Sequence, residues 1–174
     1  MRQIFSSRRK FGYWRRIWVA LAAAQRELGL PIEAAQIAAM ERAVDDIDFD
    51  AAAVHERNLR HDVMAHVHAF GDLVPEAAGL IHLGATSQDV VCNADLLIQR
   101  DALGLTAGKI ASVVDRLGHF ASMHRDLPTL GFTHYQPAQP TTVGKRATLW
   151  AQDLLIGLEE IESVRDGLRL RGMR

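Results

Sequence analysis

Apolar residues recur at helical spacing along most of the chain, and strand-like alternation of useful length is missing. The spacing predicts a first helix over residues 11–28, ended by Gly29 and Pro31, and a second helix over residues 33–44. A third helix is expected over residues 51–70. These patterns together predict an all-α fold.

Two longer helical patterns follow. Within residues 89–125, apolar residues repeat every seven positions, as in the seam of a helical bundle. The repeat is formed by Leu96, Leu103, Ile110 and Leu117. Gly104, Gly108 and Gly118 each weaken this helix by about 1 kcal/mol relative to alanine, so we expect another helix to approach closely at these points. A matching apolar pattern runs from Val143 to Leu168.

Two helices of this length cannot bury such apolar faces by themselves. We therefore expect the chain either to form an oligomer or to be a piece of a longer protein. Residues 1–85 are expected to form an N-terminal helical domain. Residues 86–174 are expected to form the start of an incomplete domain of long bundled helices.

The composition is that of a globular protein, with 48% hydrophobic and 24% charged residues. The net charge of −1 and the short apolar runs argue against nucleic-acid and membrane partners. No acidic residue precedes Glu27 in the arginine-rich N-terminal stretch, which is consistent with a cleaved leader, an anionic partner or a solvated helix face. Helical spacing favours the last, with arginines extending around Trp14 and Trp18 into solvent. The lone Cys92 excludes an intramolecular disulfide and favours a cytoplasmic location.

The segment over residues 131–141 places His134 among hydroxyl and amide side chains, between the two long helical patterns. Pro137 and Pro140 fix φ and remove backbone donors, so a loop is expected here. A histidine on a rigid loop can transfer protons near neutral pH. The alternative is an interhelical loop with an incidental histidine.

A second polar cluster combines Arg60, His61 and Asp62 with the nearby His66 and His68. Histidines on one face of a helix could bind a metal ion. However, the two-histidine zinc signature requires a glutamate beside the first histidine and a third ligand, and neither is present in that form. We therefore expect no metal, and we expect His66 and His68 to lie within a helical interface.

A third cluster places Thr86 and Ser87 directly before the first long helix. The exposed N–H groups and hydroxyls at a helix start suit a carboxylate or phosphate, although a plain N-cap is an equally good interpretation. No nucleotide fingerprint or nucleophile elbow accompanies these clusters. They indicate proton-transfer chemistry on a carboxylate-bearing small molecule, without a cofactor.

Three ordered motifs, in residues 60–67, 82–87 and 133–142, resemble those of the adenylosuccinate lyases in the fumarase/aspartase superfamily. The resemblance implies a cofactor-independent β-elimination in purine biosynthesis. It splits adenylosuccinate into AMP and fumarate, and it also removes fumarate from the succinylated aminoimidazole carboxamide ribotide. The resemblance further implies a homotetramer in which each active site draws on three subunits.

By motif, His134 resembles the general acid that protonates the departing nitrogen, and His61 resembles a substrate-positioning group. The other matching positions are expected to bind substrate. Arg60 and Asp62 lie beside His61, and Thr86 and Ser87 are expected to hold the succinyl carboxylate. Thr133 and Gln136 lie beside His134.

The chain also departs from the family pattern. The flexible serine loop that supplies the family's catalytic base and an N-terminal arginine–tyrosine pair are absent, and Cys92 stands where an aspartate is common. The family chain is also much longer. We therefore expect an N-terminal portion of such a lyase, inactive alone; the alternative is a non-catalytic helical assembly module.

Overall fold

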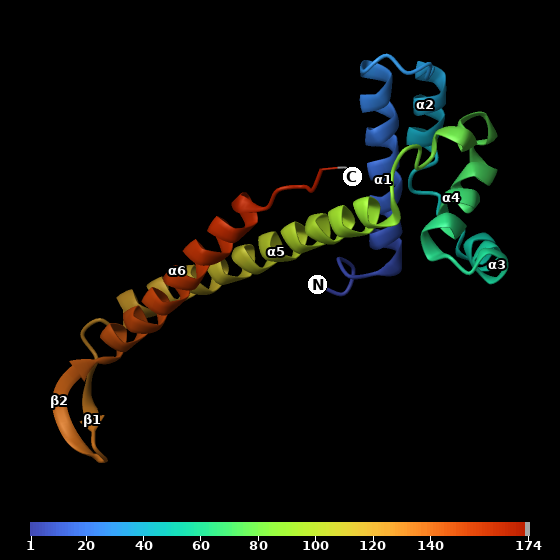
Figure 1. The fold of residues 1–174 in the computed structure, drawn as a ribbon. Coiled ribbons are helices and arrows are strands. Elements are labelled where there is room, and N and C mark those ends of the chain that lie inside the picture. Colours follow the sequence, from blue (N-terminus) through green and yellow to red (C-terminus); the bar gives the residue numbers. More distant parts are fainter. Residues whose placement is uncertain (173–174) are drawn as a thin grey trace. The chain divides into compact units, whose positions relative to one another are not determined.

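The computed structural model describes residues 1–172 and is mostly helical, with one two-stranded sheet (Figure 1). The expected all-α class is confirmed, with this small sheet as an addition. The chain forms two compact units: Met1–Gln99 with the segment from Arg169, and Arg100–Leu168. The domain boundary expected near Thr86 stays a prediction. Of the helices within residues 1–172, none combines the length and apolar composition needed to cross a bilayer.

Five helices make up most of the first unit. They are α1 (Ser7–Glu27), α2 (Ala34–Arg42), α3 (Phe49–Leu59), α4 (Asp62–Leu73) and the 3₁₀ helix η1 (Pro75–Leu80). The single helix expected over residues 51–70 is wrong, because Arg60 adopts a left-handed conformation with φ 52° and ends α3. His61 then caps α4 by accepting a hydrogen bond from the Met64 N–H at 3.4 Å.

The core of the first unit is aromatic. Trp14, Trp18, Met40 and Phe70 are fully buried. The Trp18 ring stacks on Phe70 with centroids 6.3 Å apart and meets Trp14 edge-on at the same centroid distance. Such pairs combine a large buried apolar area with a preferred geometry, so α1, α2 and α4 pack in one defined arrangement.

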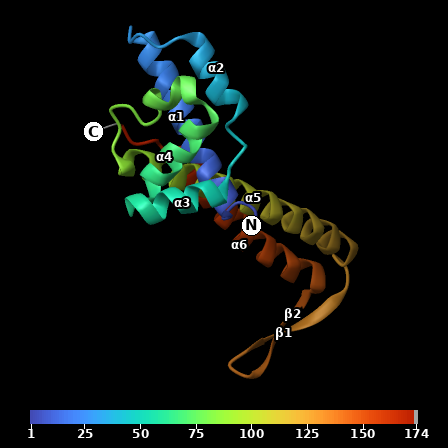
Figure 2. The ribbon, with the colours of Figure 1, turned by 90° about the vertical axis from the view of Figure 1, so that its right-hand side faces the viewer.

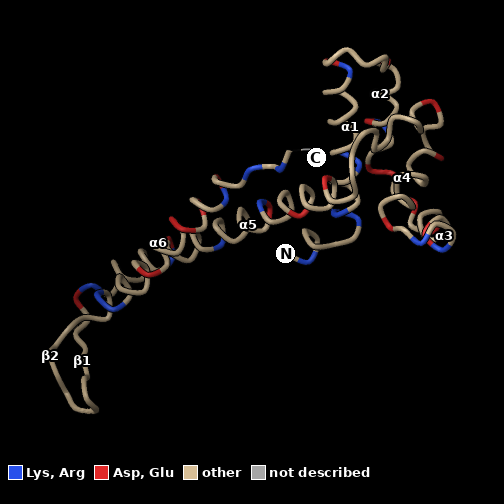
Figure 3. Tube along the Cα trace, viewed as in Figure 1, with Lys and Arg blue, Asp and Glu red and all other residues tan. Residues whose placement is uncertain are grey.

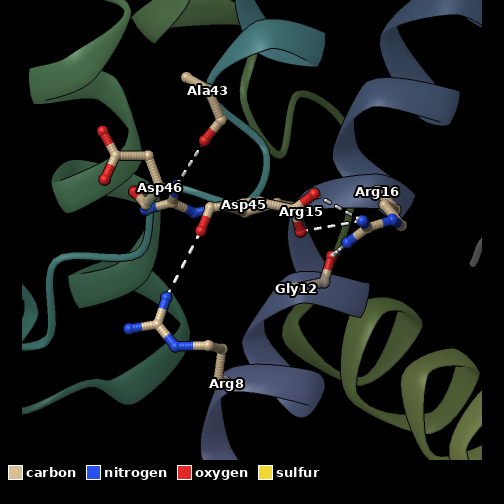
Figure 4. A network of polar contacts seen from close by, with 7 residues as sticks. All are labelled: Arg8, Gly12, Arg15, Arg16, Ala43, Asp45 and Asp46. Carbon is tan, nitrogen blue, oxygen red and sulfur yellow. Dashed lines mark hydrogen bonds and ion pairs between the residues drawn. The ribbon is translucent and has the colours of Figure 1, made fainter.

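The expectation of solvated arginines on α1 is wrong for Arg15, which is 1% exposed. Its Nη1 donates to the carbonyl oxygens of Ala43 at 2.8 Å and Asp46 at 2.6 Å (Figure 4). Arg16 beside it forms an ion pair with Asp45, in which Nη2 lies 2.8 and 2.9 Å from the two carboxylate oxygens. The acidic connector after α2 therefore binds part of the basic N-terminal stretch.

The second unit contains most of the long helix α5 (Ser87–Met123), an antiparallel hairpin of β1 (Pro128–Thr133) and β2 (Gln136–Thr142), and helix α6 (Val143–Gly167). Within this unit α5 and α6 run side by side in both Figure 1 and Figure 2. Both long helices agree with the apolar repeats of the sequence.

The glycines of α5 do not mark a close helix approach. A Cβ at Gly104, Gly108 or Gly118 would have no neighbouring atom within 4 Å, so that expectation is wrong for the described residues. The tight point is Gly144 at the start of α6, where a Cβ would collide with the Ala121 carbonyl oxygen of α5. A glycine is therefore required at the junction of the two helices, and not along their length.

The loop expected over residues 131–141 is instead the β-hairpin. Its tip pairs Thr133 with Gln136, and the register shifts by one residue near Gly131. A Cβ at Gly131 would lie 2.9 Å from the Gln139 carbonyl oxygen, which explains a glycine at this bulge. Figure 3 shows the hairpin free of Lys, Arg, Asp and Glu.

Candidate active site

The strained backbone positions coincide with the three sequence motifs. Among residues 1–172, the non-glycine residues with positive φ are Arg60, His82, His134 and Tyr135. Each belongs to one of the three motifs. Left-handed backbone at a non-glycine residue costs of order 1–3 kcal/mol and concentrates at functional sites. The backbone therefore singles out the same three segments as the side-chain chemistry does.

His134 and Tyr135 form the two-residue turn of the hairpin, with φ values of 49° and 59°. Positive φ at both central positions matches a type I′ turn, which ordinarily prefers asparagine and glycine. His134 is exposed at this tip, and the closing pair on either side is Thr133 and Gln136. The structure therefore brings together the three residues that the sequence assigns to the general acid and its neighbours.

The hairpin is tied to the start of α6. Arg146 Nη2 donates to the Leu130 carbonyl oxygen at 2.8 Å. The Val143 N–H donates to the Leu127 carbonyl oxygen at 2.9 Å. Thr142 caps α6 by accepting from the Lys145 N–H at 3.1 Å. These bonds fix the base of the ribbon that carries His134.

His61 lies in a second cluster, in the first unit. Its Nδ1 accepts the N–H of Met64, so the neutral ring carries its proton on Nε2. That Nε2 lies 3.4 Å from the Ser87 Oγ, and the Asp62 carboxylate lies 3.7 Å from Nδ1. Arg60 is exposed directly before them. The structure thus brings His61, Asp62 and Ser87 together from two motifs.

The start of α5 is partly occupied by its own residues. The Thr86 N–H donates to the Asp89 carboxylate at 2.8 Å, and Asp89 is 5% exposed. This bond runs from the residue before the helix to the third helical residue, as in one half of a capping box, and it differs from the Thr86 or Ser87 N-cap that the sequence left as an alternative. Thr86 also lines a cavity of about 870 Å³, together with Gln88, Asp89, Cys92, Arg171 and Gly172. A small polar ligand can therefore approach Thr86 from this cavity.

His82 connects the second motif to the aromatic core. Its φ is 68°, and its Nδ1 accepts a hydrogen bond from Trp18 Nε1 at 3.1 Å. Burial lowers the pKa of His82, while the nearby Asp89 carboxylate opposes the shift. His82 therefore acts as an acceptor that fixes the backbone before Thr86. Sequence reasoning gave it no role, and its place in the motif was the signal.

His66 and His68 are not part of this cluster. His66 is 6% exposed and stacks on Phe11 at 3.6 Å. Burial and the positive charge of Arg15 lower its pKa to about 4. His66 therefore lies in the helical interface, as expected. His68 also lies at a contact between helices, because its ring stacks on His55 of α3 at 5.4 Å, but its side chain is exposed.

The two histidine clusters belong to different compact units. His61, Thr86 and Ser87 lie in the first unit, and His134 lies with Thr133 and Gln136 in the second. The convergence of His61 and His134 on one substrate stays a prediction. Within residues 1–172, no group of three His, Cys, Asp or Glu side chains is arranged to hold a metal ion.

Comparison with known proteins defines the class to which the chain belongs. The family model described as lyase matches residues 1–172, and the chain is a member of this lyase family. Its similar relatives include the adenylosuccinate lyases of Saccharomyces cerevisiae, 48% identical over 100% of this chain, and of Schistosoma mansoni, 46% identical over 98%. The chain spans 37% and 36% of the length of these two relatives.

Solved structures agree with this assignment. A fumarate lyase from Mesorhizobium sp. BNC1 matches 93% of the chain with a TM-score of 0.82 and 29% identity. A 3-carboxy-cis,cis-muconate lactonizing enzyme from Pseudomonas putida matches 94% with a TM-score of 0.81 and 31% identity. The chain covers 38% of each of these structures. Since related folds carry different reactions, the site rather than the fold must carry the argument for function.

Proposed function

We propose that this chain is part of an enzyme that releases fumarate from adenylosuccinate, forming AMP, and from the succinylated aminoimidazole carboxamide ribotide. The observation that carries the proposal is the 48% identity to an adenylosuccinate lyase over the whole chain. The strained positions within the three motifs support it, because strain at Arg60, His82 and His134 is retained only where surrounding structure stabilises it.

His134 is the proposed general acid. In the elimination, a base takes the proton from the carbon next to a carboxylate, the electron pair of that C–H bond forms the double bond of fumarate, and the C–N bond breaks. The base is proposed to be the family's serine, outside the residues of this chain. The departing nitrogen takes a proton from the His134 ring. Its exposed position at the hairpin tip, between Thr133 and Gln136, supports this role because the ring is accessible to a substrate.

The first-unit cluster is proposed to bind the substrate. His61 donates from Nε2, and Arg60 and Asp62 contact the substrate beside it. Ser87 and Thr86 bind the succinyl carboxylate through their hydroxyls. The 3.4 Å contact between His61 and Ser87 supports a shared site for these residues. Fixed donors of this kind stabilise the negative charge that develops during proton removal.

A homotetramer in the cytoplasm is proposed as the working state. The second unit supports an assembly, because large apolar side chains on α6 are exposed. They include Leu149, Trp150, Ile156 and Val164. No cofactor is required, because the reaction needs only proton transfers and charge stabilisation.

The test uses the protein expressed from its complete reading frame, with adenylosuccinate as substrate and fumarate release followed by absorbance. We expect His134→Ala to reduce kcat by about 10²- to 10⁴-fold, the range for loss of a proton-transfer group. His119→Ala is the matched control, since His119 is an exposed histidine of the same unit. Native helicity by circular dichroism with near-normal turnover in His134→Ala would contradict the assignment. A folded wild-type protein that releases no fumarate would favour the assembly module.

A further inference from the structure

Asn93 makes an unusual set of bonds for a side chain within a long helix. It is 5% exposed, and its Nδ2 donates to the Asp89 carbonyl oxygen at 2.7 Å and to the Arg171 carbonyl oxygen at 3.1 Å. Its Oδ1 accepts the Arg171 N–H at 2.7 Å. One amide thus pairs with both main-chain groups of a residue 78 positions away, as a neighbouring β-strand would.

This pairing holds the segment that follows α6 against the start of α5, within the first unit. Leaving buried donors or acceptors unpaired is unfavourable, so the position of Arg171 depends on Asn93. Asn93 thus holds the main chain of a residue that lines the same cavity as Thr86.

The consequence appears in the cavity of about 870 Å³, which Arg171 lines together with Thr86 and Gln88. The Asp89 carboxylate in its wall already accepts the Thr86 N–H. The other polar side chains in the lining are the Thr86 hydroxyl, the Gln88 amide, the Cys92 thiol and the Arg171 guanidinium. A guanidinium offers a planar fork of donors that matches a carboxylate in a bidentate arrangement, so the lining suits a carboxylate.

We propose that Asn93 is a positioning residue for the lyase reaction and that it acts through Arg171, whose guanidinium binds a carboxylate of the succinyl group in this cavity. The inference rests on the proposed function, which places Thr86 at the succinyl carboxylate. It adds a cation at this carboxylate, and it assigns a role to a buried residue that touches no substrate.

The experiment compares Asn93→Ala, Arg171→Ala and the double variant, made in the protein expressed from its complete reading frame. We expect each single variant to raise KM for adenylosuccinate by roughly 10- to 100-fold, the range for a hydrogen bond to a charged group, with a smaller change in kcat. The double variant should lose no more than either single variant, because both remove the same contact. Asn58→Ala, at an exposed asparagine of α3, is the matched control and should leave KM unchanged.

A purely structural role for Asn93 would lower the melting temperature and leave KM unchanged in the folded variants, and this result would overturn the proposal. Additive effects in the double variant would also overturn it, because Asn93 would not act through Arg171. Arg171→Ala keeps the test decisive if Asn93→Ala does not fold, since Arg171 is exposed.

Calorimetric titration with fumarate separates this inference from the proposed function. A wild-type protein that releases no fumarate, yet binds fumarate and loses that binding in Arg171→Ala, would refute the proposed reaction and retain the carboxylate site. Fumarate binding that is absent from the wild type, or equal in the wild type and Arg171→Ala, would overturn the site itself.

Discussion

Trp18 in the first compact unit is fully buried, whereas Trp150 in the second is 57% exposed, although both lie in long amphipathic helices. The same difference holds across the two units. The first unit buries Trp14, Trp18 and Phe70 in one core that includes residues of α2 and α4. Of the described residues in the second unit, only Ala107, Ala121, Gly144 and Ala147 are buried.

An apolar repeat in the sequence therefore has two different outcomes in this chain. In the first unit the apolar face meets other helices, and burial of each large side chain contributes roughly 1.5–3 kcal/mol. In the second unit two helices present a broad apolar surface to solvent, and local helix formation and the junction at Gly144 must hold them together. Stability should thus depend on core side chains in one unit and on backbone geometry in the other.

The largest expected effect contrasts the two tryptophans. Trp18→Ala should lower the free energy of unfolding by about 3–5 kcal/mol, because it leaves a cavity in the core and removes the hydrogen bond to His82. Trp150→Ala should change it by less than about 0.5 kcal/mol. Urea denaturation of both variants measures the contrast. Equal losses of unfolding free energy in the two variants would show that Trp150 is buried in solution. The two units would then not differ in the way described.

A smaller effect depends on pH and belongs to the first unit alone. Burial and Arg15 lower the pKa of His66 to about 4 in the folded protein, against 6.5 in the unfolded chain. Above pH 6.5 both states are neutral and the full stability is present. As pH falls from 6.5 to 4, His66 takes up a proton in the unfolded state but stays neutral in the folded state. The free energy of unfolding therefore falls by up to about 3 kcal/mol.

His66→Leu removes this titration, and its stability should therefore fall less steeply than that of the wild type between pH 6.5 and 4. His119→Leu, in the second unit, is the control; its side chain is 77% exposed, and it should leave the pH dependence unchanged. Guanidinium denaturation at several pH values provides the measurement. Parallel curves for the wild type and His66→Leu would refute the assignment.

Backbone geometry should dominate in the second unit. Gly144→Ala places a Cβ against the Ala121 carbonyl oxygen and 2.8 Å from the Arg125 Cα, and backbone atoms cannot move aside cheaply. We expect a loss of about 1–3 kcal/mol, typical of overpacking. Gly157→Ala is the control in the same helix, because a Cβ there meets no atom within 4 Å. A loss in Gly144→Ala no larger than in the control would show that the junction is looser than described.

The helices with long apolar repeats could be predicted from the sequence, because α1, α5 and α6 each carry apolar residues at regular helical spacing, whether or not the chain itself buries them. The break between α3 and α4 at Arg60 could not be predicted. It depends on a left-handed backbone at Arg60, and no glycine there indicates such a conformation. The hairpin was missed for the same reason. Its turn uses His134 and Tyr135 where asparagine and glycine are usual, and its strands contain three prolines.

The candidate site was recognisable by motif, but its internal contacts were not. The sequence assigned Ser87 and His61 to one substrate, and the structure adds their 3.4 Å contact. The sequence alone could not reveal the hydrogen bond between Thr86 and Asp89 or the pairing of Asn93 with Arg171, because these bonds depend on the folded positions of the residues. Motifs therefore identified the residue types, and tertiary packing determined their partners.

The smallest expected effect tests the open face of α5. A Cβ at Gly108 meets no atom within 4 Å in the second unit, so Gly108→Ala should raise stability by about 0.5–1 kcal/mol through helix propensity alone. Thermal denaturation followed by circular dichroism measures it. A loss of stability would mean that another surface packs against Gly108 in solution, since only a close neighbour can make one added methyl unfavourable there. The exposed face of the second unit would then be an interface, and its sparse core would be completed from outside the chain.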